Sequence, residues 1–72
     1  MRRRRSLARL RARREQLQAE LIDCKERHAW FKASDDPFEL QEANAWAAQV
    51  AALEHALSAL EIEIFKAELD EL

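Results

Sequence analysis

The chain has 72 residues with no glycine, one proline and a formal net charge of only −2. Hydrophobic residues make up 49% and charged residues 36%, a composition typical of long helices and not of a sheet with turns. Because there is no tyrosine, no glycine-rich loop, a single cysteine and too little chain to enclose a pocket, we expect neither an enzyme nor a site for a metal, a cofactor or a small-molecule substrate.

The single cysteine excludes an internal disulfide and suits a reducing compartment. No apolar run approaches the roughly 18 residues that a membrane span requires. The arginine-rich start is not followed by an apolar stretch with a small-residue cleavage site, so a secretory signal is not expected. These features predict a cytoplasmic protein that does not contact a membrane.

The small net charge hides a segregation of charges along the chain. Residues 1–14 carry +8, all of it from arginine, whereas residues 15–32 carry −1 and residues 33–72 carry −9. The chain is therefore an electrical dipole with a basic start and an acidic second half.

The first expected element is a helix over about residues 5–33. Its apolar residues recur with alternating spacings of three and four, which is the a/d pattern of a heptad repeat. The predicted seam consists of Leu7, Leu10, Arg14, Leu17, Leu21, Cys24, His28 and Phe31. Cys24 and His28 share one face, but two further metal ligands are missing, so we expect both in or near the core.

A turn is expected at residues 34–36, immediately before a strong helix-start signal. Asp36 has the side chain of an N-cap, Pro37 suits the first helical position, and Glu39 stands where the partner of a capping box would be. The signal predicts that the second helix begins at residue 37.

The second expected helix covers about residues 37–70 and repeats the heptad pattern. Its predicted seam consists of Ala43, Trp46, Val50, Leu53, Leu57, Leu60, Ile64 and Ala67. Two heptad stripes joined by a short loop must pack antiparallel. The predicted fold is therefore all-α, a single domain over residues 1–72 formed by an antiparallel, coiled-coil-like two-helix hairpin.

The second helix also carries an apolar stripe outside its seam, although a surface helix needs only one apolar face. One hairpin of this size gains only about 3–5 kcal/mol from its core, so a partner is expected. A homodimeric four-helix bundle is the simplest arrangement, and a different protein is the alternative. The residues expected to contact a second chain or a partner are Trp30, Ile62, Phe65, Leu69 and Leu72. Trp30 could instead cover the turn against Phe38 or Leu40.

The arginine tract leaves three hypotheses open. Its exposed face on a helix would consist of Arg2, Arg5, Arg9 and Arg13. These side chains could bind the phosphates of a nucleic acid, with an affinity that falls as salt rises, or they could bind an acidic protein surface. They could also remain in solvent, or pair with the acidic end of the second helix, which an antiparallel turn brings alongside.

In outline the chain resembles the Rop-type plasmid regulators, two-helix chains of about this length that form antiparallel dimers and bind paired RNA loops. Its second half, through Leu53, Leu57 and Leu60, resembles the small hairpin co-chaperones of type III secretion needles, which are partners in a heterocomplex. Neither resemblance assigns a family, because an architecture does not determine a function.

Together these features predict a small non-enzymatic protein-interaction module that acts as a homodimeric helical hairpin. Such a module would be an adaptor, a chaperone or an inhibitor of another protein. The alternative is a nucleic-acid-binding regulator that uses the arginine-rich start of the first helix.

Overall fold

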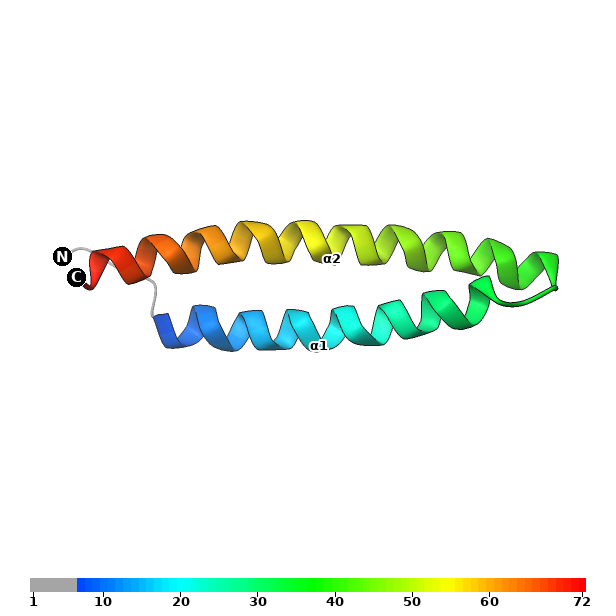
Figure 1. Ribbon diagram of the computed structural model, residues 1–72, viewed down its shortest axis with the longest axis horizontal. Helices are drawn as coiled ribbons and strands as arrows, with labels where there is room; N and C mark the ends of the chain where they lie inside the picture. The colour runs from blue at the N-terminus through cyan, green and yellow to red at the C-terminus, as the bar shows by residue number, and fades with distance from the viewer. Residues whose placement is uncertain (1–6) are drawn as a thin grey trace.

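The computed structural model describes residues 7–72, which form two α-helices joined by a short turn (Figure 1). Helix α1 is Leu7–Lys32 and helix α2 is Pro37–Asp70. The helices run antiparallel side by side over their whole shared length, and the molecule measures 57 × 18 × 14 Å. The predicted all-helical hairpin is therefore confirmed, with no strand among the described residues. The expected start of the first helix near residue 5 lies outside those residues.

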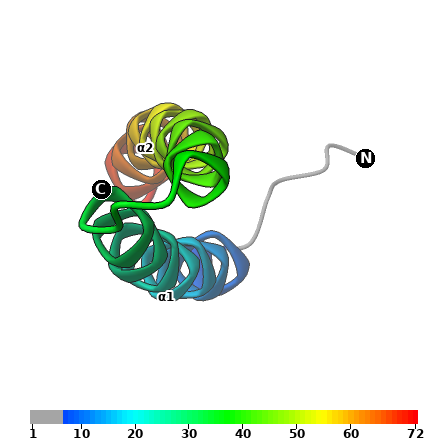
Figure 2. The same cartoon turned by 90° about the vertical axis from the view of Figure 1, so that its right-hand side faces the viewer.

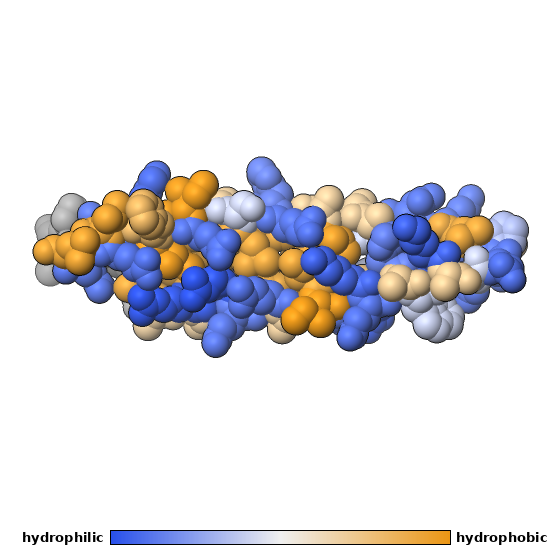
Figure 3. Space-filling model, viewed as in Figure 1, coloured by the Kyte–Doolittle hydropathy of each residue, from blue (hydrophilic) through white to orange (hydrophobic). Residues whose placement is uncertain are grey.

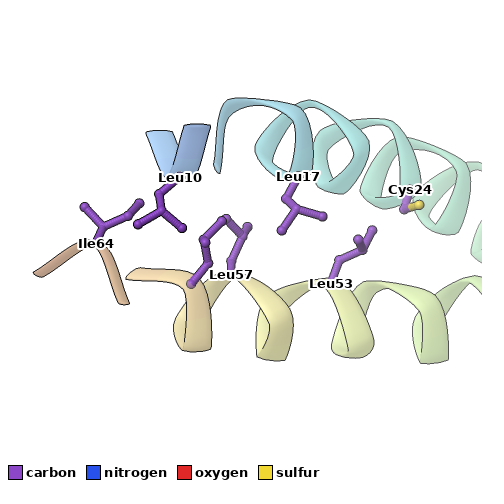
Figure 4. Packing of buried hydrophobic residues seen from close by; sticks show 7 residues of the cluster. Leu10, Leu17, Cys24, Leu53, Leu57 and Ile64 are labelled. Carbon is purple, nitrogen blue, oxygen red and sulfur yellow. The ribbon is translucent and has the colours of Figure 1, made fainter. Parts of the chain in front are cut away.

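The predicted heptad seam is the line along which the two helices meet. Every seam position of α1 is buried or half-buried, and every other residue of that helix is exposed. The same positions of α2 are also buried or half-buried, and Glu39, Ala47 and Ala56 are half-buried beside them. Side chains of the two helices point toward one another between the ribbons (Figure 4). The buried residues are Leu10, Leu17, Cys24, Ala43, Leu53, Leu57, Leu60 and Ile64.

The seam also accounts for the path of the helices. Seen from the turn, the helices are inclined and wind about each other instead of lying as two straight parallel rods (Figure 2). A straight helix falls behind a strict seven-residue repeat by about 20° in every heptad, so helices that keep such a seam in contact must supercoil.

The turn is built without glycine, and no residue of the described chain has a positive φ angle. The amide of Ala33 donates to the carbonyl of Ala29 at 3.2 Å, and the amide of Ser34 donates to the carbonyl of Phe31 at 3.1 Å. These two bonds satisfy carbonyls at the end of α1 that a left-handed glycine cap would often serve. The chain leaves the helix at Lys32, one residue earlier than the approximate limit predicted from the sequence.

The predicted start of α2 is confirmed, with one change to its capping box. The carboxylate of Asp36 accepts from the amide of Phe38 at 2.9 Å, and Pro37 occupies the first turn. The amide of Asp36, expected to donate to Glu39, donates instead to the hydroxyl of Ser34 at 3.0 Å. That hydroxyl in turn donates to the Glu39 carboxylate. Ser34 can replace Glu39 as the direct acceptor because it lies only two residues before the N-cap.

Candidate interaction surfaces

The outer face at the end of α2 carries the largest group of predicted contact residues. We call this group the C-terminal face. Its side chains are 57%, 59%, 50% and 101% exposed, in the order Ile62, Phe65, Leu69 and Leu72. The space-filling view shows apolar side chains gathered at the end of the hairpin that carries the C-terminus (Figure 3). Isolated exposed apolar residues are common, but four along consecutive turns form a patch of the kind that marks contact sites.

Helical geometry explains why this face is separate from the core. Ile62 and Ile64 are two residues apart, which turns their side chains about 200° away from each other. Ile64 points into the seam and is 3% exposed, whereas Ile62 is 57% exposed. The residues of the C-terminal face follow the same outward direction at spacings of three and four, so they lie one above another along α2.

Trp30, the fifth predicted contact residue, does not join the C-terminal face. It lies near the turn, whereas Phe65 lies near the opposite end of the hairpin. Its ring stands edge-on to Phe31, with centroids 4.8 Å apart, and the side chain remains 63% exposed. Phe38 is 79% exposed and Leu40 is 41% exposed, so whether Trp30 covers the turn against one of them stays a prediction.

The described part of the arginine tract lies beside the acidic end of α2. The Arg11 guanidinium forms an ion pair with the Glu68 carboxylate at 2.9 Å, and both side chains are about half exposed. Arg9 and Arg13 are exposed, and Arg13 donates to the side-chain oxygen of Gln16 at 3.0 Å. The predicted pairing between the basic start of the chain and the acidic end of α2 is therefore observed for Arg11 and Glu68. Arg2 and Arg5 lie outside the described residues.

A second ion pair lies on the same flank of the hairpin as Arg11 and Glu68. Lys25 Nζ is 3.7 Å from a carboxylate oxygen of Glu54. In both pairs the base belongs to α1 and the acid to α2. A parallel or shifted arrangement would separate these partners, so the pairs favour the antiparallel register, as charges beside a coiled-coil seam commonly do.

One contact across the helices has no counterpart in the sequence prediction. The Arg27 guanidinium lies over the ring of Trp46, 5.2 Å from the ring centroid, and also donates to Asp23 at 3.1 Å. A guanidinium at this distance from an indole makes a cation–π interaction. The heptad pattern predicted that Trp46 lies in the seam. Only the register between the two helices shows that the Arg27 guanidinium lies over its ring.

The remaining chemistry-bearing residues do not gather into a site. Cys24 is a buried free cysteine of the core, as predicted, and His28 is half-buried in the seam. Within residues 7–72 no group of three or more histidine, cysteine or acidic side chains is arranged to hold a metal ion. Neither of the two described helices has the length and apolar character of a membrane span.

Comparison with known proteins found no matching family model, no matching curated protein and no matching solved structure.

Proposed function

We propose that this protein is a non-enzymatic interaction module that binds another polypeptide through the C-terminal face of α2, as an adaptor, a chaperone or an inhibitor does. The observation that carries the proposal is the exposure of Ile62, Phe65 and Leu69 on one face of a helix whose opposite face already forms the core. Each of these side chains leaves half or more of its surface in water. Covering the rest on binding would contribute roughly 1–1.5 kcal/mol per residue, since full burial contributes about twice that.

A photo-cross-linking experiment tests this proposal directly. Phe65→p-benzoylphenylalanine puts a reactive group in the centre of the C-terminal face, and Ala45→p-benzoylphenylalanine puts it on an exposed position of the same helix, near the turn and outside that face. In the native host, the first variant should give a discrete cross-linked polypeptide and the second should not. A folded Phe65 variant that gives no discrete product would refute the proposed function.

A second copy of the chain is the other candidate for the polypeptide that covers this surface. The hairpin is a single layer of two helices, and even Ile64, the most buried core side chain of the described residues, is 3% exposed. Packing two hairpins into the four-helix bundle expected from the sequence would shield the core from solvent on one side of this layer. Sedimentation equilibrium at micromolar concentration should then give twice the 8.4 kDa mass of the chain. A folded species of 8.4 kDa would contradict the dimer and leave a different protein as the partner.

Nucleic-acid binding stays a proposal of a different class, supported by the exposure of Arg9 and Arg13 on the start of α1. A gel-shift titration with duplex and single-stranded probes tests it. Binding should weaken steeply and linearly on a plot of log affinity against log salt. The absence of a shifted band even at low salt would contradict it.

A further inference from the structure

The C-terminal face is bordered by carboxylates. At 100° per residue, Glu61 and Glu68 lie on one side of it, and Lys66 followed by Asp70 lies on the other. Glu71 comes directly after the helix, in line with the seam. All of these side chains are exposed. Glu68 already pairs with α1, but no ion pair joins Glu61, Asp70 or Glu71 to another residue of the part of the chain that the structure describes. Among residues 7–72, Glu61 and Asp70 are therefore the carboxylates beside the apolar patch that take part in no ion pair.

The end of α2 adds to this negative field. The last turn of the helix contains no basic residue, and the helix ends at Asp70. The carbonyl groups at the end of a helix carry a partial negative charge, which a nearby cation stabilises. Lys66 is the one base among residues 33–72, so it offsets only part of this charge.

The same face of a second copy is a poor match for such a surface. Packing one C-terminal face against the same face of another copy would bring two sets of these carboxylates together. Like charges brought together across an interface disfavour that partner by several kcal/mol. The apolar residues are complementary to an apolar partner surface. The acidic residues beside them are complementary to basic residues that flank that partner surface.

Resting on the proposed function, we infer that the C-terminal face of α2 docks a basic amphipathic helix of another protein. Ile62, Phe65 and Leu69 have the i, i+3, i+7 spacing of anchors in helix-to-helix recognition and span about two turns. The apolar stripe of the partner helix covers these anchors. Its flanking lysine or arginine side chains reach Glu61 and Asp70.

Binding of designed peptides to the full chain tests the inferred chemistry. The probe is a fluorescently labelled amphipathic helix of about 18 residues, with leucine at helix-spaced positions and lysine elsewhere, and its matched peptide carries glutamate in place of every lysine. Anisotropy should show binding of the lysine peptide, an affinity that falls with added salt, and at least tenfold weaker binding of the glutamate peptide. Equal affinities for the two peptides would overturn the inference.

Variants of the protein locate the binding site. Phe65→Gln with Leu69→Gln should weaken the lysine peptide about tenfold or more, and Ile22→Gln with Phe38→Gln, which removes exposed apolar side chains elsewhere, should leave it unchanged. Glu61→Gln with Asp70→Gln should weaken binding several-fold and flatten its salt dependence. Glu15→Gln with Glu20→Gln is the matched control on α1. Equal losses in both charge variants would overturn the inferred site.

The failure of this inference can be told apart from failure of the proposed function. A discrete heterologous cross-link at Phe65 together with equal binding of both peptides would uphold an interaction module and reject a basic partner. Cross-linking of Phe65 to a second copy, with a dimer that Phe65→Gln and Leu69→Gln dissociate, would also reject it. Loss of every cross-link at Phe65 would reject both.

Discussion

Ile62 and Ile64 are the same amino acid two positions apart, and they occupy opposite environments. Ile64 is 3% exposed in the seam between the helices, whereas Ile62 is 57% exposed on the outer face of α2. The same contrast holds between the buried leucines of the seam and Leu69 of the C-terminal face. Apolar side chains on the seam hold this hairpin together. Those on the C-terminal face do not belong to the cluster packed between α1 and α2, which is why we propose that they contact a partner.

The largest expected effect compares these two isoleucines directly. Ile64→Ala should lower the free energy of unfolding by about 2–4 kcal/mol, because it leaves a cavity in a core only one layer deep. Ile62→Ala should change it by less than about 0.5 kcal/mol, since the side chain is already largely in water. Urea denaturation followed by circular dichroism at one fixed protein concentration measures both.

A milder variant keeps this comparison measurable if Ile64→Ala does not fold. Ile64→Val should cost about 0.5–1.5 kcal/mol and Ile62→Val close to nothing. If the two positions show equal losses, the seam and the outer face are not distinct surfaces.

A smaller effect is expected at the turn, which sets the register of the seam without touching the C-terminal face. Asp36→Ala removes the acceptor for the Phe38 amide and should lower the free energy of unfolding by about 1 kcal/mol. Asp35→Ala, a change of the same type at the preceding residue, is the control and should have a smaller effect. Binding of the lysine peptide should survive in the folded fraction of both variants. A loss of binding confined to Asp36→Ala would link the turn to the distant face.

The contact between Arg27 and Trp46 should contribute about 0.5–1 kcal/mol, since the base is partly exposed. A double-mutant cycle with Arg27→Ala and Trp46→Leu isolates this coupling from the loss of the Trp46 side chain itself. Because Arg27 also bonds to Asp23, Asp23→Ala is measured beside it. A coupling of zero would show that Trp46 stabilises the seam by burial alone.

The smallest effect is expected for the ion pair between Arg11 and Glu68, on the flank between the seam and the outer face. Both side chains are about half exposed, so the pair should contribute only about 0.2–1 kcal/mol. The coupling, measured in a cycle of Arg11→Ala and Glu68→Ala, should decline as salt is raised. The pair of Lys25 and Glu54 is longer, at 3.7 Å, and should show a smaller coupling. A coupling that does not change with salt would contradict a solvent-screened ion pair.

Local patterns in the sequence predicted most of the fold. The heptad spacing from Leu7 to Phe31 identified the buried face of α1, because side chains three and four apart share one side of a helix. Asp36 and Pro37 identified the start of α2 because capping depends on a few neighbouring residues. The predicted acceptor of the Asp36 amide was wrong. Ser34 and Glu39 both lie near this amide in the sequence, and the sequence pattern does not choose between them.

The candidate site was predictable only in part. Ile62, Phe65, Leu69 and Leu72 were named from the sequence and share one outer face, but Trp30, grouped with them, lies near the other end of the hairpin. The contact between Arg27 and Trp46 had no sequence signal. It depends on the relative axial position of two helices, which the spacing within each helix does not contain.

The sequence alone determined that this chain forms two helices, where the second begins and which side chains meet between them, because these properties follow from local spacing and local hydrogen bonds. Only the tertiary structure decided how much of the apolar surface outside the seam α1 covers. The apolar stripe of α2 outside the seam, which extends from Leu40 to Leu72, runs straight along the helix. The seam shifts around the helix by about 20° in every heptad. The stripe therefore starts beside the seam at Leu40, which is 41% exposed, and reaches the outer face by Ile62. That divergence leaves the C-terminal face uncovered by α1.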